Sequence, residues 1–305
     1  GGVELRFKVP QGNNSWDDDI AQIYEDYNVY LIYKDLQKED FNRSWTGTTY
    51  GSGYEGQGCV NDEMTNYYVE FMKKQIFAYL NPPITSKVLP MYWYLGYNVH
   101  SKSVLEIGGV ILASWIVPIH ENRDGLDYWC TCMFGEDNPG DPYLIPTDRA
   151  VLDRRRKMIL GPILEKAVKA GNIVIPEEFE AGFDHVTNLV RGLGMEDDPN
   201  YYLTRGYPGS VNTYVFNSIS TPDNNSYPPT NEETFIGYMH LSMFYNQAQL
   251  AEEYPADKYP FLAEKFAFVQ KYLKDKYQID LEAIANGPEN WDLPLPPIPE
   301  TPDEE

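Results

Sequence analysis

The chain has 305 residues, of which 42% are hydrophobic and 14% aromatic, so it can bury a sizeable core as one large domain or two smaller ones. Its formal net charge of −22, from 24 basic and 46 acidic residues, repels phosphate backbones and anionic lipid surfaces, which argues against a nucleic-acid-binding protein. Its apolar runs are far shorter than the roughly 20 residues needed to span a bilayer, so we expect no transmembrane helix.

The first third of the chain is rich in strand patterns. Residues 5–9 alternate between apolar and polar side chains, and residues 28–33 are β-branched and aromatic, so both predict strands. Residues 17–24, between them, predict a helix. Residues 33–62 are rich in Gly and Thr and have no clear period, which predicts a long surface loop.

A helix is predicted from Asn61 to Tyr79, where Pro82 and Pro83 end it. Three strand candidates follow, over residues 88–95, 104–117 and 128–134, and Gly108-Gly109 interrupts the second of them.

The hydrophobic period changes from two to 3.6 near Pro146. The first helical pattern places four apolar residues on one face: Leu152, Ile159, Ile163 and Ala167. We expect Gly161-Pro162 to break this helix, because an interior proline removes a backbone hydrogen bond at a cost of about 3 kcal/mol.

Three further helices are predicted after this first one. The earliest begins at Pro176, the next is opened by a capping box from Thr230 to Glu233, and the last carries an apolar stripe over residues 262–273. The Pro-rich, acidic residues 287–305 predict an extended or disordered tail. Strands first and helices afterwards predict an α+β fold, with a strand-rich part (1–146) and a helix-rich part (147–286) in a single domain over residues 1–286.

The motifs of common hydrolases are missing from the sequence. The four histidines, His100, His120, His185 and His240, lie at least 20 residues apart, so they cannot form the His-Glu-x-x-His helix of a zinc peptidase. No Gly-x-Ser-x-Gly nucleophile elbow occurs. The 46 acidic residues leave a glycosidase carboxylate pair open without indicating one, and residues 137–141 favour a solvated turn over a Ca²⁺ site.

The three cysteines, Cys59, Cys130 and Cys132, are best interpreted as thiols packed in the core. Two alternatives remain open: a disulfide from Cys59 to one of the other two, and a Cys-x-Cys metal site that would need two further ligands.

Three segments of the second half carry a resemblance to a known family. They are Pro176-x-Glu178-Phe179 after a long helix, the Glu233-x-Phe235 helix, and the ending from Val269 to Ile284. With the order of the elements, they resemble the substrate-import-associated zinc metallohydrolase lipoproteins of Bacteroidetes, also named zinc-binding metallopeptidases. The resemblance covers roughly residues 20 to 285 and implies a zincin-like fold, with an N-terminal mixed sheet followed by a helical C-terminal half.

The metal-binding positions of that family are altered in this chain. The resemblance aligns Ile163 and Ala167 with the two histidines of His-Glu-x-x-His, Leu164 with the general base, and Gly237 with a further Glu. A slip of one residue would instead place the histidines at Pro162 and Lys166. None of these can bind zinc. The resemblance therefore implies a zincin scaffold without catalytic residues, metal or cofactor.

Aromatic residues are the remaining candidates for a binding surface, since the chain has 25 tyrosines and six tryptophans. Two clusters could present their rings to a sugar or a peptide: Tyr92, Trp93 and Tyr94, and Tyr201, Tyr202 and Tyr207. The alternative is that these rings pack in the core.

The leading hypothesis is a non-catalytic binding or accessory protein of a nutrient-import system, at the cell surface or in the periplasm. Its expected partners are a peptide or glycan polymer and outer-membrane import proteins, with membrane attachment only through a lipid anchor. We expect a lipoprotein signal that ends in a cysteine shortly before Gly1. The alternatives are an active zinc metallohydrolase that uses His185, His240 and nearby carboxylates, and a purely structural interaction module.

Overall fold

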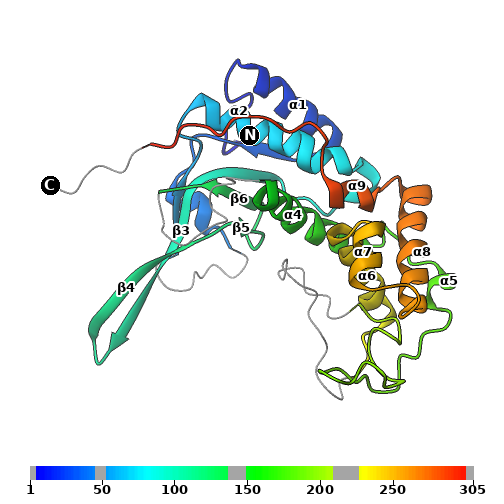
Figure 1. The fold of residues 1–305 in the computed structure, drawn as a ribbon. Helices are drawn as coiled ribbons and strands as arrows, with labels where there is room; N and C mark the ends of the chain where they lie inside the picture. Colours follow the sequence, from blue (N-terminus) through cyan, green and yellow to red (C-terminus); the bar gives the residue numbers. More distant parts are fainter. Residues whose placement is uncertain (1–4, 45–52, 137–148, 209–226, 300–305) are drawn as a thin grey trace. The chain divides into compact units, whose positions relative to one another are not determined.

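A computed structural model of the chain describes residues 5–44, 53–136, 149–208 and 227–299 (Figure 1). The chain forms two compact units. Unit 1 comprises residues 1–73, 89–152 and 292–305, and unit 2 comprises residues 74–88 and 153–291. The expected single domain over residues 1–286 stays a prediction.

Unit 1 is built on a mixed sheet, which has six strands in the described part of the chain. Four of them follow the order β1 (Tyr30–Ile32), β3 (Tyr92–Ile107), β6 (Tyr128–Phe134) and β5 (Glu121–Asn122). β1 and β6 run parallel to β3, whereas β2 (Tyr54–Gln57) and β4 (Val110–Pro118) pair with it antiparallel. β3 therefore pairs with β1, β2, β4 and β6 and holds the sheet together.

The core of unit 1 is aromatic because the first half of β3 and all of β6 are buried. Tyr94 and Tyr128 stack at 4.6 Å between ring centroids, and Phe7 meets Tyr92 edge-on at 5.1 Å. Helices α1 (Ser15–Tyr27) and α2 (Asp62–Phe71) lie side by side next to this sheet (Figure 1). α2 is joined to it through Tyr68, whose hydroxyl donates to Gly96 O and accepts from the Met133 N–H.

Unit 2 holds most of the helices. They are α3 (Pro82–Thr85), α4 (Arg149–Lys169, which begins in unit 1), α5 (Glu177–Glu180), α6 (Asn231–Phe244), α7 (Gln247–Glu253), α8 (Pro260–Tyr277) and α9 (Leu281–Asn286). The predicted capping box is confirmed, because Thr230 Oγ1 accepts from the Glu233 N–H at 3.2 Å and Glu233 Oε1 accepts from the Thr230 N–H at 3.0 Å. The apolar stripe of α8 is fully buried. No helix of the described residues is both long and apolar enough to cross a bilayer.

The α+β prediction is confirmed, with the mixed sheet in the N-terminal half and the helices mainly in the C-terminal half. Gly108 and Gly109, at φ of 60° and 80°, form the turn between β3 and β4, where the sequence predicted an interruption. The helix predicted from Asn61 begins as α2 and then changes to a π-helix (Met72–Ile76) and a 3₁₀-helix (Phe77–Tyr79).

The predicted strand over residues 5–9 is wrong. This segment consists of bends and pairs with no strand of the described residues. Its period-two pattern has another cause: Phe7 inserts its ring into the core beside Tyr92 and Tyr94, while Arg6 forms an ion pair with Asp40 at 2.6 Å.

The predicted loop over residues 33–62 is also partly wrong, because it contains a 3₁₀-helix (Lys38–Asn42) and β2. The sequence of β2 shows no strand pattern, because Gly56 stands where a strand would normally carry a side chain. A Cβ at Gly56 would lie 2.8 Å from Val99 Cγ2, so the close approach of β2 to β3 requires glycine.

The predicted break at Gly161-Pro162 is wrong as well, since α4 runs without interruption from Arg149 to Lys169. Residues 159–164 are all buried. The packing of this whole turn offsets the roughly 3 kcal/mol that an interior proline costs an isolated helix.

Residues 287–299 are extended, as predicted for the tail. Within unit 1, the Asn61 side chain donates to Pro297 O at 2.8 Å, which holds this segment at the start of α2.

Tyr68→Phe tests the junction between α2 and the sheet. The substitution leaves the buried Met133 N–H without its acceptor, so we expect the free energy of unfolding to fall by about 2 kcal/mol in denaturant titrations. Tyr94→Phe is the matched control, because the Tyr94 hydroxyl is buried without a hydrogen-bond partner in the structure, and its removal should be neutral or stabilising. Equal losses from the two substitutions would contradict this account.

Candidate functional site

The positions that the family resemblance aligns with a zinc site lie in the core of unit 2. Ile163, Leu164 and Ala167 on α4 have no exposed surface, and Gly237 on α6 is buried. α4 is buried almost all round at this point, because residues 159–164 are apolar or small. Its motif positions therefore contact only protein.

Zinc does not fit these four positions. It requires nitrogen, sulfur or oxygen donors at about 2.0–2.3 Å, and Ile, Leu, Ala and Gly side chains provide none. Over residues 5–44, 53–136, 149–208 and 227–299, no group of three or more His, Cys, Asp or Glu residues is arranged to hold a metal ion. A Lewis-acid role cannot be assigned to α4 and α6.

His240 is the one histidine close to the altered positions, three residues after Gly237 on α6. Its ring faces Gly161 of α4, where an added Cβ would lie 3.8 Å from Nε2. Burial lowers the pKa of His240 to about 4, and a contact with the Gly161 backbone raises it by a smaller amount. The imidazole is therefore neutral at physiological pH and fills space between two helices.

The other three histidines lie elsewhere. His100, on β3 of unit 1, contacts Asn98 O through Nδ1 at 2.7 Å and lies 3.5 Å from a Glu55 carboxylate oxygen through Nε2. His120 precedes β5 in unit 1, and its carbonyl accepts from the Cys132 N–H. His185 lies in a loop of unit 2. The displaced zinc site considered from the sequence is not assembled from His185 and His240 among the described residues.

All three cysteines lie in unit 1 as thiols rather than disulfides. Cys130 and Cys132 are buried on β6, and Cys59 Sγ lies 3.8 Å from Leu95 O. Burial raises the pKa of the Cys59 thiol to about 12, which keeps it protonated and unreactive.

The aromatic residues that the sequence offered for binding are buried. The exposed fraction is 8% or less for every one of Tyr92, Trp93, Tyr94, Tyr201, Tyr202 and Tyr207. The Trp93 indole donates to Thr131 Oγ1, and the Tyr207 hydroxyl donates to Asp184 O. The structure thus favours the alternative interpretation, in which these rings pack.

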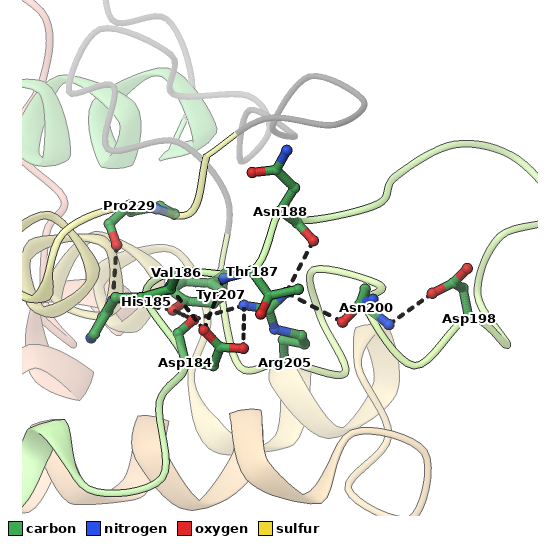
Figure 2. Close-up of polar contacts among 10 residues, drawn as sticks. All are labelled: Asp184, His185, Val186, Thr187, Asn188, Asp198, Asn200, Arg205, Tyr207 and Pro229. Atoms are coloured by element: carbon green, nitrogen blue, oxygen red, sulfur yellow. Dashed lines mark hydrogen bonds and ion pairs between the residues drawn. The ribbon is translucent and has the colours of Figure 1, made fainter.

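A polar cluster that the sequence analysis missed lies in unit 2, in the segment from 184 to 207 (Figure 2). Asp184 begins it with a tight turn, where Oδ1 accepts from the N–H groups of Val186 at 2.8 Å and Thr187 at 2.9 Å. Hydrogen bonds from Thr187, and then from the Val186 N–H, hold the pKa of the Asp184 carboxyl well below its usual range.

Arg205 holds the rest of the 184–207 segment together. Its guanidinium donates to Asp184 O at 2.7 Å and to Asn188 O at 3.1 Å, and its side chain is only 9% exposed. Tyr207 adds a hydrogen bond to Asp184 O at 2.6 Å, and His185 Nδ1 lies 2.9 Å from Pro229 O (Figure 2). Most of these contacts go to backbone carbonyls, so the cluster fixes a loop.

The cluster in Figure 2 does not form an acid–base relay. Tyr207 lies 3.1 Å from His185 Nδ1, but its contact to Asp184 is to the carbonyl oxygen and not to the carboxylate. A relay needs a titrating partner at that position. The pattern Asp-x-Val-Thr, in which a short acidic side chain can accept from the following N–H groups, was the signal for the turn in the sequence.

Comparisons with known proteins give no family for this chain. No family model matches it, and no curated protein matches it. The crystal structure of a protein from Bacteroides caccae ATCC 43185, provisionally named a zinc-binding metallo-peptidase, is similar over 90% of this chain and 92% of its own. The sequence identity is 13% and the TM-score 0.42, so this similarity carries no argument about residues or activity.

His240, which lies between α4 and α6, should make stability depend on pH. The unfolded chain binds a proton here below about pH 6.5, but the folded chain only below about pH 4. Because the unfolded state binds more protons between these values, the free energy of unfolding should fall as the pH drops through this range, by at most about 3 kcal/mol from this residue.

His240→Leu should remove this part of the pH dependence. We expect the difference in unfolding free energy between the native protein and the variant to shift by about 3 kcal/mol between pH 7 and pH 4 in denaturant titrations. Parallel pH profiles for the native protein and His240→Leu would contradict the assignment.

Proposed function

We propose that this chain is a non-catalytic relative of zincin metallopeptidases that acts as a binding or accessory protein of a nutrient-import system. Its location at the cell surface or in the periplasm, with a lipid anchor to the outer membrane, is part of the proposal and rests on the resemblance of the segments at 176–179, 233–235 and 269–284. The observation that carries the proposal is the donor-free, fully buried set Ile163, Leu164 and Ala167.

Peptide hydrolysis by a zincin depends on a metal that activates water and on a carboxylate that accepts its proton. In this chain, α4 presents alkyl groups at those positions, and they have no exposed surface that could meet water or substrate. To restore zinc-dependent hydrolysis, metal-binding side chains would have to replace several of these alkyl side chains. The core around them would also have to open to water and substrate.

The 184–207 segment supports the binding part of the proposal. It presents Val186 at 84% exposure and Leu193 at 100%. Hydrogen bonds from Arg205 and Tyr207 hold the backbone at Asp184 and Asn188, on either side of Val186, and the Val190 N–H donates to Asn200 O ahead of Leu193. Apolar side chains on a fixed loop lose little conformational entropy when they contact a ligand. We propose that they contact an extended peptide or glycan, in the role that the sequence assigned to the six buried aromatic residues.

Purified native protein should contain no stoichiometric zinc, and chelators should leave its melting temperature unchanged. The reason is the lack of donors at Ile163, Leu164, Ala167 and Gly237, since bound metal would stabilise the folded state. Elemental analysis and thermal unfolding with and without chelator provide the measurements. One equivalent of tightly held zinc, or peptide hydrolysis that a chelator abolishes, would establish the metallohydrolase alternative instead.

Peptide and glycan arrays should show binding without cleavage. Val186→Ser with Leu193→Ser should reduce the signal at least tenfold, because it removes the exposed apolar contacts and leaves the Arg205 hydrogen bonds in place. Met91→Ser in unit 1, where Met91 is 55% exposed, is the matched control and should bind like the native protein. If no polymer binds the native protein, a purely structural role replaces the binding proposal.

A further inference from the structure

Strands β3 and β4 continue beyond the rest of the sheet as a two-stranded ribbon (Figure 1). β6 pairs with β3 as far as Tyr97, and β2 pairs with it as far as Ser101. From Lys102 to Ile107, the only strand of the described residues beside β3 is β4. The ribbon spans residues 102–117.

The ribbon is both apolar and exposed. Nine large hydrophobic side chains on it have exposed fractions between 36% and 63%: Val104, Leu105, Ile107, Val110, Ile111, Leu112, Trp115, Ile116 and Val117. The register places Leu105, Ile107, Val110, Trp115 and Val117 on one face of the ribbon and Val104, Ile111 and Ile116 on the other. Exposed apolar side chains that gather in this way mark interaction surfaces.

Charge is almost missing from this surface. The register pairs Ser103 with Trp115, Leu105 with Ala113 and Ile107 with Val110, so one face of the ribbon is uncharged. Lys102 and Glu106 lie on the opposite face, and Lys102 forms an ion pair with Glu55 at 3.4 Å. β4 itself carries no charged residue over 110–117, in a chain whose net charge is −22.

The outer edge of β4 carries no charged side chain over residues 110–117. β4 pairs with β3 on one side, and its other side faces no strand of the part of the chain that the structure describes. Edge strands are usually protected from further pairing by a charge, a lysine, a proline or a β-bulge. β4 has an irregular register opposite Leu105 and Glu106 and ends at Pro118, but its uncharged residues leave room for a further strand.

Another occupant fits the ribbon less well. A lipid bilayer offers no hydrogen-bond partners for the open backbone edge of β4, and such edges do not occur in the hydrocarbon region. The occupant must be a strand that is free of charge and apolar.

We propose that β4 pairs antiparallel, edge to edge, with β4 of a second copy of this chain. Residues 110–117 are apolar except for Ser114 and carry no charge, so any antiparallel register brings mainly apolar residues opposite one another and no like charges together. The ribbon is the part of the surface where two copies with a charge of −22 each can approach.

Sedimentation velocity at increasing protein and salt concentration tests this proposal. We expect reversible dimers that become stronger as salt screens the net charge. A basic variant, Ala113→Lys with Trp115→Lys, and an acidic variant, Ala113→Glu with Trp115→Glu, should each weaken dimerisation at least tenfold. Mixing the two variants should restore dimers, which also shows that both variants are folded.

Met91→Lys, at a methionine outside the ribbon that is 55% exposed, is the matched control and should dimerise like the native protein. A native protein that stays monomeric at every salt concentration would overturn the proposal. So would dimers that persist in both charged variants, since the interface would then lie elsewhere. Flotation of monomers with zwitterionic vesicles, lost in both charged variants, would assign the ribbon to lipid instead.

Discussion

The bend of β3 between Gly96 and Val99 is the constraint on which unit 1 depends. A Cβ at Gly96 would lie 2.6 Å from Val99 Cγ2, and Asn98 has a φ of 52°, so the strand turns sharply at a place where only glycine fits. The register with β6 shifts between Gly96 and Tyr97 and the pairing ends there. Before the bend, β3 is buried between parallel neighbours. After it, β3 pairs antiparallel with β2 and β4.

This bend also explains the position of Tyr68. Its hydroxyl binds Gly96 O at the bend and the Met133 N–H on β6, where the register shift disturbs the ladder between the two strands. A buried backbone group that loses its ladder partner needs another one. Tyr68 of α2 supplies this partner. One side chain therefore satisfies the Met133 N–H and attaches α2 to the sheet.

In unit 2, the corresponding support is Arg156 on α4, which has no exposed surface. Its guanidinium donates to Gln75 Oε1 and Asp153 Oδ1 at 2.7 Å each, and its Nε donates to Ile284 O at 2.9 Å. These bonds join α4 to the 74–88 segment and to the end of α9. They fix the part of α4 that precedes the buried turn over residues 159–164.

The sequence predicted those elements whose pattern comes from their own residues. The Thr230 capping box and the α8 stripe are local, and both are found. β2 was missed because its glycine is explained by Val99, a residue 43 positions later. The tyrosines were offered as a surface because a list of aromatic residues does not show which of them fill a core. In the structure, Tyr94 stacks on Tyr128, and Tyr201 meets Tyr202 edge-on.

The positions aligned with the zincin ligands carry no metal-binding side chains and are buried. The apolar ribbon of β3 and β4, in contrast, lies at the surface. A buried apolar cluster such as Ile163, Leu164 and Ala167 stabilises the fold, because each side chain removes apolar area from water. The apolar ribbon of β3 and β4 has the opposite effect on an isolated copy, since it leaves such area in water. Contacts that cover the ribbon would take this apolar area out of water, as the core does for Ile163, Leu164 and Ala167.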